Sequence, residues 1–198
     1  TISEGTITYD ITVKTGNKEP QMADAFDGAV STVYLKGGLS RTDMVSALGS
    51  ERTIHDSRKG DAVVLKEYSG QKLMITLTKE NWIAKNKKYE GVKFTYTKET
   101  KTISGYTCTK ATATLQDGRT ITVYYANDLV AMNREYDNMF KDLPGLPMEY
   151  VFESEKQKFT YTVSKIDLSP VALSKFDYPK TGYRVMTYDE SKQAGKKE

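Results

Sequence analysis

The sequence predicts a mainly β (α+β) fold, in which a single antiparallel sheet curves into a half-open barrel with short helices over its concave face. Three observations support this prediction. Apolar and polar residues alternate along several segments, as they do in half-buried strands. Turn-forming residues separate these segments at intervals of about ten residues. Only three short segments have the residue spacing of an amphipathic helix.

The alternating segments are typical of antiparallel strands with one buried face. In the first of them, Ile7, Tyr9 and Ile11 share one face, whereas threonines dominate the other. Threonine suits the wet face because its branched Cβ fits the pleat and its hydroxyl stays solvated. The same pattern predicts strands at residues 5–13, 72–78, 109–115, 120–125 and 159–163.

Glycine-containing pairs occur where one predicted strand has to return into the next. Gly37-Gly38, Gly49-Ser50, Gly60-Asp61 and Ser69-Gly70 lie between alternating segments, as expected for a strand meander. Asp117-Gly118 predicts a tight hairpin of type I′. Consecutive strands should therefore be neighbours in the sheet.

Helical spacing predicts three short amphipathic helices, at residues 21–29, 80–87 and 128–141. Their large apolar residues need a surface to cover, and the concave face of the sheet provides one. We expect residues 1–188 to form a single domain. Residues 189–198 are polar and are predicted to be a disordered tail.

Composition excludes several classes of function. Lys and Arg number 29 and Asp and Glu 26, and both signs are spread along the chain, which disfavours a nucleic-acid-binding protein. One Cys and one His exclude a metal site built from several of these residues. No apolar run approaches the ~20 residues of a membrane-spanning helix. No phosphate-binding loop or dinucleotide fingerprint is present, so we expect no cofactor and no metal.

The two residues most often used in catalysis do not form a recognisable site. His55 and Asp56 are neighbours on a predicted strand and point to opposite faces, so we interpret them as the end of a strand before a turn. Cys108 lies far along the chain from the only histidine, and we expect it to be a small core residue. We therefore predict no catalytic residue and no enzyme activity.

Aromatic and methionine side chains suggest a cavity between sheet and helices. The chain has 14 Tyr, 6 Phe and 7 Met, and methionine is common on surfaces that adapt to apolar ligands. The alternative is that these side chains simply fill the interface between sheet and helices. The predicted ligand-binding residues of the cavity are Val33, Leu35, Leu73, Ile75, Leu77, Trp82, Ile121, Val123, Met132, Tyr136, Met139 and Phe140, the last four residues being candidates for a movable lid.

Two short motifs occur at residues 5–9 (Gly-Thr-Ile-Thr-Tyr) and 142–147 (Asp-Leu-Pro-Gly-Leu-Pro). They resemble the first strand and the naming motif of the GLPGLI-type family of bacterial envelope proteins, which is similar, like a related group of envelope domains, to the Lol-type lipoprotein carriers. The segments 36–41, 53–56 and 63–65 resemble the related envelope group. The resemblance implies a half-open barrel with helices at its mouth.

The resemblance also implies a setting and a role. We expect a non-catalytic envelope protein in the periplasm or anchored to the outer membrane, with an export signal removed before Thr1. Its expected partner is a lipid or the acyl chain of a lipoprotein, bound in the open cavity. The alternative is a structural or interaction domain with a filled core that binds an envelope protein. Neither alternative involves a nucleic acid or a transmembrane segment.

Overall fold

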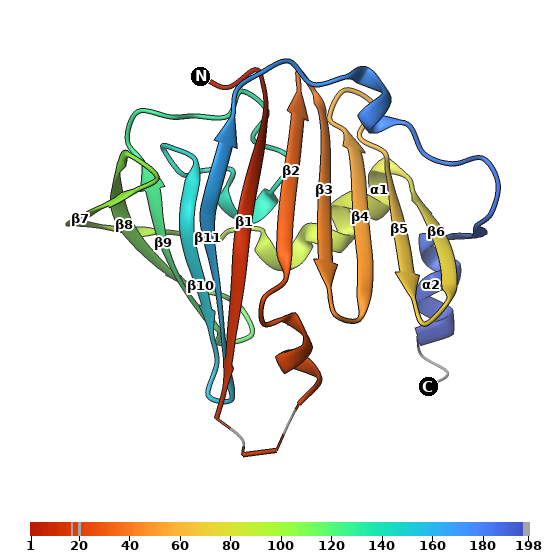
Figure 1. The fold of residues 1–198 in the computed structure, drawn as a ribbon, viewed down its shortest axis with the longest axis horizontal. Helices are drawn as coiled ribbons and strands as arrows, with labels where there is room; N and C mark the ends of the chain where they lie inside the picture. Colours follow the sequence, from red (N-terminus) through yellow and green to blue (C-terminus); the bar gives the residue numbers. More distant parts are fainter. Residues whose placement is uncertain (17, 20, 196–198) are drawn as a thin grey trace.

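The protein is a single twelve-stranded sheet that curls around its inner face (Figure 1). The computed structural model describes residues 1–16, 18–19 and 21–195. The sheet order is β12-β6-β5-β4-β3-β2-β1-β11-β10-β9-β8-β7. This arrangement confirms the predicted fold class. The strand bounds are β1 Glu4–Thr15, β2 Val30–Lys36, β3 Leu39–Ser46, β4 Gly49–Asp56, β5 Ala62–Tyr68, β6 Gln71–Leu77, β7 Thr95–Ile103, β8 Tyr106–Thr114, β9 Thr120–Ala126, β10 Pro147–Glu153, β11 Gln157–Asp167 and β12 Arg184–Thr187.

Strand β1 joins two meanders into one sheet. It pairs antiparallel with β2 on one side and with β11 on the other, so the β2–β6 and β7–β11 strands continue each other. The single departure from antiparallel pairing in the described sheet is β12, which runs parallel to β6. Its chain returns by residues 168–183, a long connection that the alternation pattern did not predict.

Helix α1 (Lys79–Asn86) and the 3₁₀ turn η2 (Lys87–Tyr89) cross the inner face of the sheet (Figure 1). Thr78 caps α1 by accepting a hydrogen bond from the Asn81 backbone N–H at 3.2 Å. Trp82 turns inward and packs with the β5 and β6 cluster that contains Val64 and Ile75. The helix predicted at residues 80–87 is thus confirmed. It packs against the inner face of the sheet at β5 and β6.

The helix predicted at residues 128–141 is wrong. That segment is mostly irregular and contains only the 3₁₀ turn η3 (Asn138–Phe140). Its backbone groups are used elsewhere, because Ile2 donates to the Val130 carbonyl oxygen and accepts from the Met132 N–H. These contacts replace the bonds that a helix would need. The first predicted helix, at residues 21–29, is likewise only a 3₁₀ turn, η1 (Met22–Phe26).

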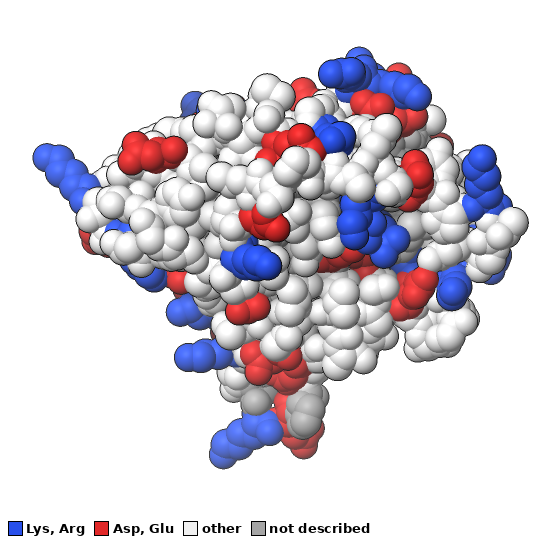
Figure 2. Space-filling view, turned by 45° about the horizontal axis from the view of Figure 1, so that its top comes forward, with Lys and Arg blue, Asp and Glu red and all other residues white. Residues whose placement is uncertain are grey.

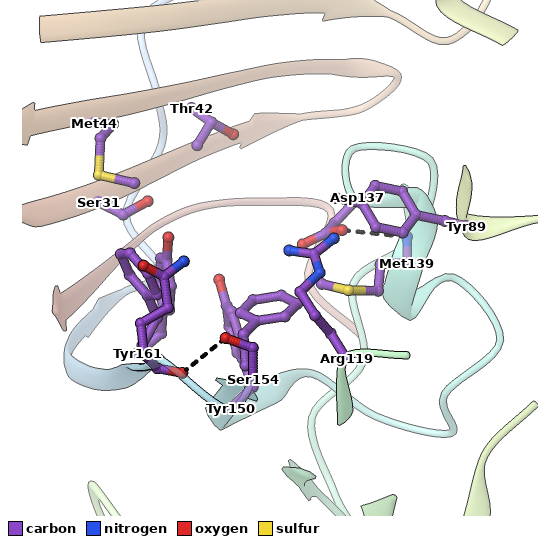
Figure 3. A pocket seen from close by; sticks show the side chains of 13 residues that line it. Ser31, Thr42, Met44, Tyr89, Arg119, Asp137, Met139, Tyr150, Ser154 and Tyr161 are labelled. Carbon is purple, nitrogen blue, oxygen red and sulfur yellow. Dashed lines mark hydrogen bonds between the residues drawn. The ribbon is translucent and has the colours of Figure 1, made fainter. Parts of the chain in front are cut away.

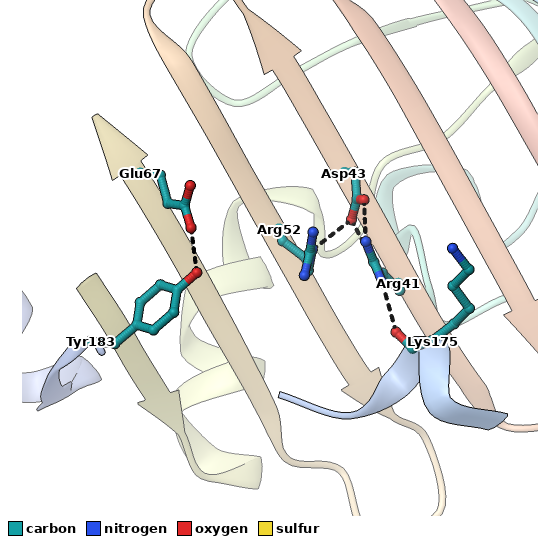
Figure 4. Close-up of polar contacts among 6 residues, drawn as sticks. All are labelled: Arg41, Asp43, Arg52, Glu67, Lys175 and Tyr183. Atoms are coloured by element: carbon teal, nitrogen blue, oxygen red, sulfur yellow. Dashed lines mark hydrogen bonds and ion pairs between the residues drawn. The ribbon is translucent and has the colours of Figure 1, made fainter. Parts of the chain in front are cut away.

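Residues 168–183, which we call the strap, cover the outer face over β3–β6. Val171 and Phe176, the latter at the end of the 3₁₀ turn η4 (Leu173–Phe176), are buried with outer-face residues of β4, β5 and β6. Polar contacts fix the strap to the strands (Figure 4). Arg41 donates to the Lys175 carbonyl oxygen at 3.0 Å while pairing with Asp43 at 2.6 Å, and the Tyr183 hydroxyl bonds Glu67. The central parts of β5 and β6 are therefore buried on both faces, with Leu65 and Met74 under the strap and Val64 and Ile75 toward α1.

The end of the chain and one turn differ from expectation. Where a disordered tail was expected from Asp189, Tyr188–Gly195 forms helix α2, and residues 196–198 of that tail lie outside the described residues. At Asp117-Gly118 only the glycine has a positive φ (+88°), so the predicted type I′ turn is wrong there. Ser69-Gly70 and Ser104-Gly105 have positive φ at both residues, as type I′ requires.

Acidic and basic side chains are interspersed over the face seen in Figure 2, with no broad region of one sign. Within the described part of the chain, no helix is long and apolar enough to cross a membrane.

Candidate ligand-binding cavity

A cavity of about 480 Å³ lies between the inner face of the sheet and the turns η2 and η3. We call it the first cavity. Figure 3 shows Ser31, Thr42 and Met44 of β2 and β3 on one side and Tyr150 and Tyr161 of β10 and β11 on another. The remaining lining residues are Tyr89, Arg119, Asp137, Met139, Phe152, Ser154, Gln157 and Phe159.

Aromatic rings form one wall of the first cavity. Strands β10 and β11 pair so that Tyr150 faces Tyr161 and Phe152 faces Phe159 across the ladder. Since alternate residues of a strand share a face, all four rings point to the inner side. Tyr150 stacks on Tyr161 with ring centroids 4.6 Å apart, and Phe152 meets Tyr161 edge to face at 6.1 Å. The wall is therefore a stacked apolar surface.

A second cavity of about 200 Å³ continues the first one toward α1. The two share the lining residues Ser31, Thr42, Asp137 and Tyr150, so they form one elongated space. The second cavity is more polar than the aromatic wall, because hydroxyl groups of β2, β3 and β4 and the ammonium of Lys85 reach it. Its other lining residues are Tyr9, Val33, Thr53, Trp82, Tyr136 and Pro147.

Asp137 is the one carboxyl group among the residues that line both cavities. Its Oδ1 accepts a hydrogen bond from the Met139 N–H at 3.3 Å, which caps η3. Burial raises the pKa of Asp137 to about 7, because few groups around it replace the water that an ionised carboxylate needs. Burial also raises the pKa of the neighbouring Tyr9 and Tyr150 hydroxyls. The junction of the cavities is thus a polar but electrically neutral site at mildly acidic pH.

His55 lies outside this space. It ends β4 as expected, is 2% exposed, and stacks on Trp82 with ring centroids 4.2 Å apart. Neither ring nitrogen has a hydrogen-bond partner in the described part of the chain, and burial lowers the pKa of the imidazole. A neutral ring without a carboxylate partner packs as an aromatic residue. Cys108 is fully buried, as the sequence predicts.

The residues predicted to line a cavity separate into three groups. Val33, Trp82, Tyr136 and Met139 do line the two cavities. Met132 is 56% exposed. The remaining residues are packed in the cores beside the cavities: Leu35, Ile121, Val123 and Phe140 in one cluster, and Leu73, Ile75 and Leu77 in the cluster of Trp82.

Several lining residues were not singled out from the sequence. Ser31, Thr42 and Thr53 occupy inward positions of β2, β3 and β4 where an apolar residue is expected. These hydroxyl residues at inward positions were the one feature of the sequence that could have indicated a polar part of the cavity. Asp137 and Lys85 gave none, because their placement depends on how the irregular segment and α1 lie over the sheet.

The segment 142–147, which carries the resemblance to the GLPGLI naming motif, packs beside the cavity against the end of β9. Leu143 and Leu146 are buried, and Leu146 donates to the Leu129 carbonyl oxygen at 2.7 Å while accepting from the Ala126 N–H at 2.9 Å. The segment thereby fixes η3 and Asp137 against β9. Its role in the structure is packing, and the relationship to the GLPGLI-type family stays a prediction.

The curled sheet, the helix and turns α1, η2 and η3 that cross its inner face, and the elongated cavity define a class of single-sheet β domains with an open cavity on the inner face. Residues 43–189 match the family described as N-glycanase peptide, N-terminal domain. The match extends over more than half of the chain, so the protein belongs to this family. A search of curated proteins finds no match.

Solved structures share the fold at low sequence identity. PNGF-II aligns with a TM-score of 0.55 and 15% identity in one crystal form, and 96% of this chain corresponds to 32% of that protein. A second crystal form of PNGF-II gives 0.55 and 16%. An uncharacterised conserved protein of Thermus thermophilus aligns with a TM-score of 0.59 and 11% identity, covering 94% of this chain and 91% of its own. The chain thus spans about a third of PNGF-II and nearly all of the Thermus protein.

Proposed function

We propose that this domain is a non-catalytic binding domain that holds an amphipathic ligand with an acyl chain in the cavity of its inner face. The observation that carries the proposal is the elongated cavity, which has a stacked aromatic and methionine wall at one end and polar groups at the other. A buried acyl chain gains about 0.8 kcal/mol per methylene, so an apolar wall suffices to hold it. The polar end suits a headgroup.

A binding role agrees with the chemistry of the lining. Asp137 is the one lining carboxyl among the described residues, whereas glycoside hydrolysis ordinarily uses two. The described residues also contain no cluster of three or more His, Cys, Asp or Glu side chains that could hold a metal ion. We therefore propose ligand recognition as the role of the domain. The resemblance of residues 5–9 and 142–147 to envelope proteins supports the further proposal that it is exported to the cell envelope.

A second candidate ligand is an oligosaccharide. The family description names an N-glycanase, and sugar rings combine a C–H face that stacks on aromatic rings with hydroxyl groups that bond polar side chains. The rings of Tyr150 and Tyr161 offer the stacking contact, and the hydroxyl groups of Ser31 and Thr42 on the opposite strands offer the hydrogen bonds. The remaining alternative is an interaction domain for an envelope protein, in which the cavity takes no small molecule.

Thr42→Trp tests the proposal by filling the cavity from the sheet side. Thr42 lines both cavities, so an indole there should occupy the space in which the ligand lies. We expect the variant to lose at least about 90% of the binding of a fluorescent C16 fatty acid analogue, measured by titration. Val45→Trp is the matched control, because Val45 is on the opposite face of β3 and is 54% exposed.

The outcomes separate the candidates. Equal binding by wild type and Thr42→Trp would overturn the cavity as the acyl site. Binding of an N-glycan oligosaccharide but of no fatty acid, with loss in Thr42→Trp only, would favour the second candidate. If neither probe binds, both ligand proposals fail, and the remaining candidate is an interaction domain for an envelope protein.

A further inference from the structure

Lys85 is a cation inside the second cavity without an ionic partner among the described residues. It lies three residues after Trp82 on α1, so both side chains share the face that the helix turns to the sheet. In the described part of the chain, no carboxylate lies within ion-pair distance of its ammonium group. An ammonium group that is partly removed from water without a partner is costly, and an incoming anion would relieve that cost.

The charged groups around Lys85 have a positive excess. Lys66 of β5 and Lys88 of η2 lie near enough to disfavour its charge, and Glu51 of β4 opposes them. Burial has the largest effect on Lys85, and together these influences lower the pKa of its ammonium group. Lys85, Lys66 and Lys88 outnumber Glu51, and Asp137 adds no negative charge to the cavity while it is protonated, below about pH 7. Under those conditions this end of the cavity favours a negatively charged group.

Hydroxyl donors complete the site. Thr42 and Thr53 are directly opposite each other in the β3–β4 ladder, and both line the second cavity with Lys85. Within the described residues neither hydroxyl makes a hydrogen bond to another protein group, so both are free to donate to a ligand. Asp137 faces the same space and, when protonated, adds an O–H donor instead of a repelling charge.

We infer that the second cavity is an anion seat, in which Lys85, Thr42 and Thr53 bind the carboxylate of a fatty-acid-like ligand. The inference rests on the proposed function, because it makes the first cavity the place of the acyl chain. It goes further in selecting a class of ligand: free acids over neutral lipids with the same chain. The chain would extend from Thr42 along Tyr150 and Tyr161.

The test compares palmitate with hexadecanol, which has the same chain length and no charge. The protein is freed of bound lipid, and each ligand is titrated by calorimetry against wild type, Lys85→Gln and Lys87→Gln. Lys87 is the matched control, since it is an exposed lysine two positions after Lys85, at the start of η2. We expect Lys85→Gln to weaken palmitate at least about tenfold, with hexadecanol and the control unchanged.

The results distinguish this inference from the proposed function. Equal weakening of palmitate and hexadecanol, or an unchanged palmitate affinity, would overturn the anion seat and leave the acyl site standing. If neither amphiphile binds, the proposed function fails. A titration with acetate then tests separately whether the second cavity binds a carboxylate. Trp82 is the only tryptophan and lines the same cavity, so its fluorescence reports this site directly. A Lys85-dependent fluorescence change would support the seat, and its absence would overturn it.

Discussion

Gly145→Ala is expected to destabilise the protein by at least about 4 kcal/mol, a loss that belongs to the exceptional range for one substitution. A Cβ atom at Gly145 would lie 1.8 Å from the carbonyl oxygen of Ala126 and 2.9 Å from its carbonyl carbon. Both obstacles are backbone atoms of the β9 end, so no side-chain rotation can relieve the overlap. The segment would have to move away from β9.

That movement would break contacts on both sides of the glycine. The Ala126 N–H bonds the Leu146 carbonyl oxygen at 2.9 Å, and the Leu146 N–H bonds Leu129 at 2.7 Å. Leu143 and Leu146 are buried and would lose their packing with the core cluster as the segment moved. Gly16→Ala is the matched control, because no heavy atom lies within 4 Å of the added methyl group there. Urea unfolding followed by circular dichroism measures both variants, and equal stabilities would contradict the close packing of Gly145.

Asp137→Asn is expected to stabilise the protein above pH 7 and to leave its stability almost unchanged near pH 4. The folded protein holds the pKa of Asp137 at about 7, against an ordinary value of 3.8. The folded state therefore binds this proton more tightly than the unfolded chain does. Stability from this group is fully present below pH 4 and is lost as pH rises toward 7.

The magnitude follows from the size of the shift. One pKa unit corresponds to about 1.4 kcal/mol, and the shift of roughly three units sets an upper limit near 4 kcal/mol. Because Asp137 is only partly buried and its ionised carboxylate keeps some contact with solvent, we expect a gain of about 2–3 kcal/mol for the variant at pH 8. Asparagine keeps the oxygen that accepts from the Met139 N–H, so the cap of η3 survives.

Unfolding free energies at pH 4, 6 and 8 measure this effect. Asp142→Asn removes an exposed carboxyl five residues further along the chain and is the matched control for net charge. A constant difference between wild type and Asp137→Asn at all three pH values would show that Asp137 does not titrate in this range. A decrease in stability at pH 8 would contradict the burial of its charge.

The strands could be predicted because their evidence is local. In β1 the residues Ile7, Tyr9 and Ile11 are buried, and Thr8 and Asp10 between them are on the other face, as the alternation requires. The tight turn at Ser69-Gly70 is equally local, because the glycine tolerates the positive φ that the turn needs. Helix α1 was found for the same reason, since Thr78 caps it and Trp82 lies on its inner face.

The irregular segment could not be predicted from its spacing. Residues 128–141 have apolar residues at helical intervals, but Ile2, 129 positions earlier in the chain than Ala131, forms a bridge with that segment. Long-range hydrogen bonds outweighed a weak local preference. The strap was missed likewise, because its contacts with Glu67 and Arg41 join parts of the chain more than a hundred residues apart.

For this protein, the sequence by itself determined β1, β6, β8, β9 and β11, the apolar face of each of them and several of the turns, because these properties depend on near neighbours and on the two-residue period. Only the tertiary structure decided where the cavity lies. Four separate parts of the chain contribute to it, and they meet only when the sheet curls beneath α1, η2 and η3. The residues concerned are Ser31, Thr42, Lys85 and Asp137. The cavity exists only in that assembly, and no single segment of the chain encodes it.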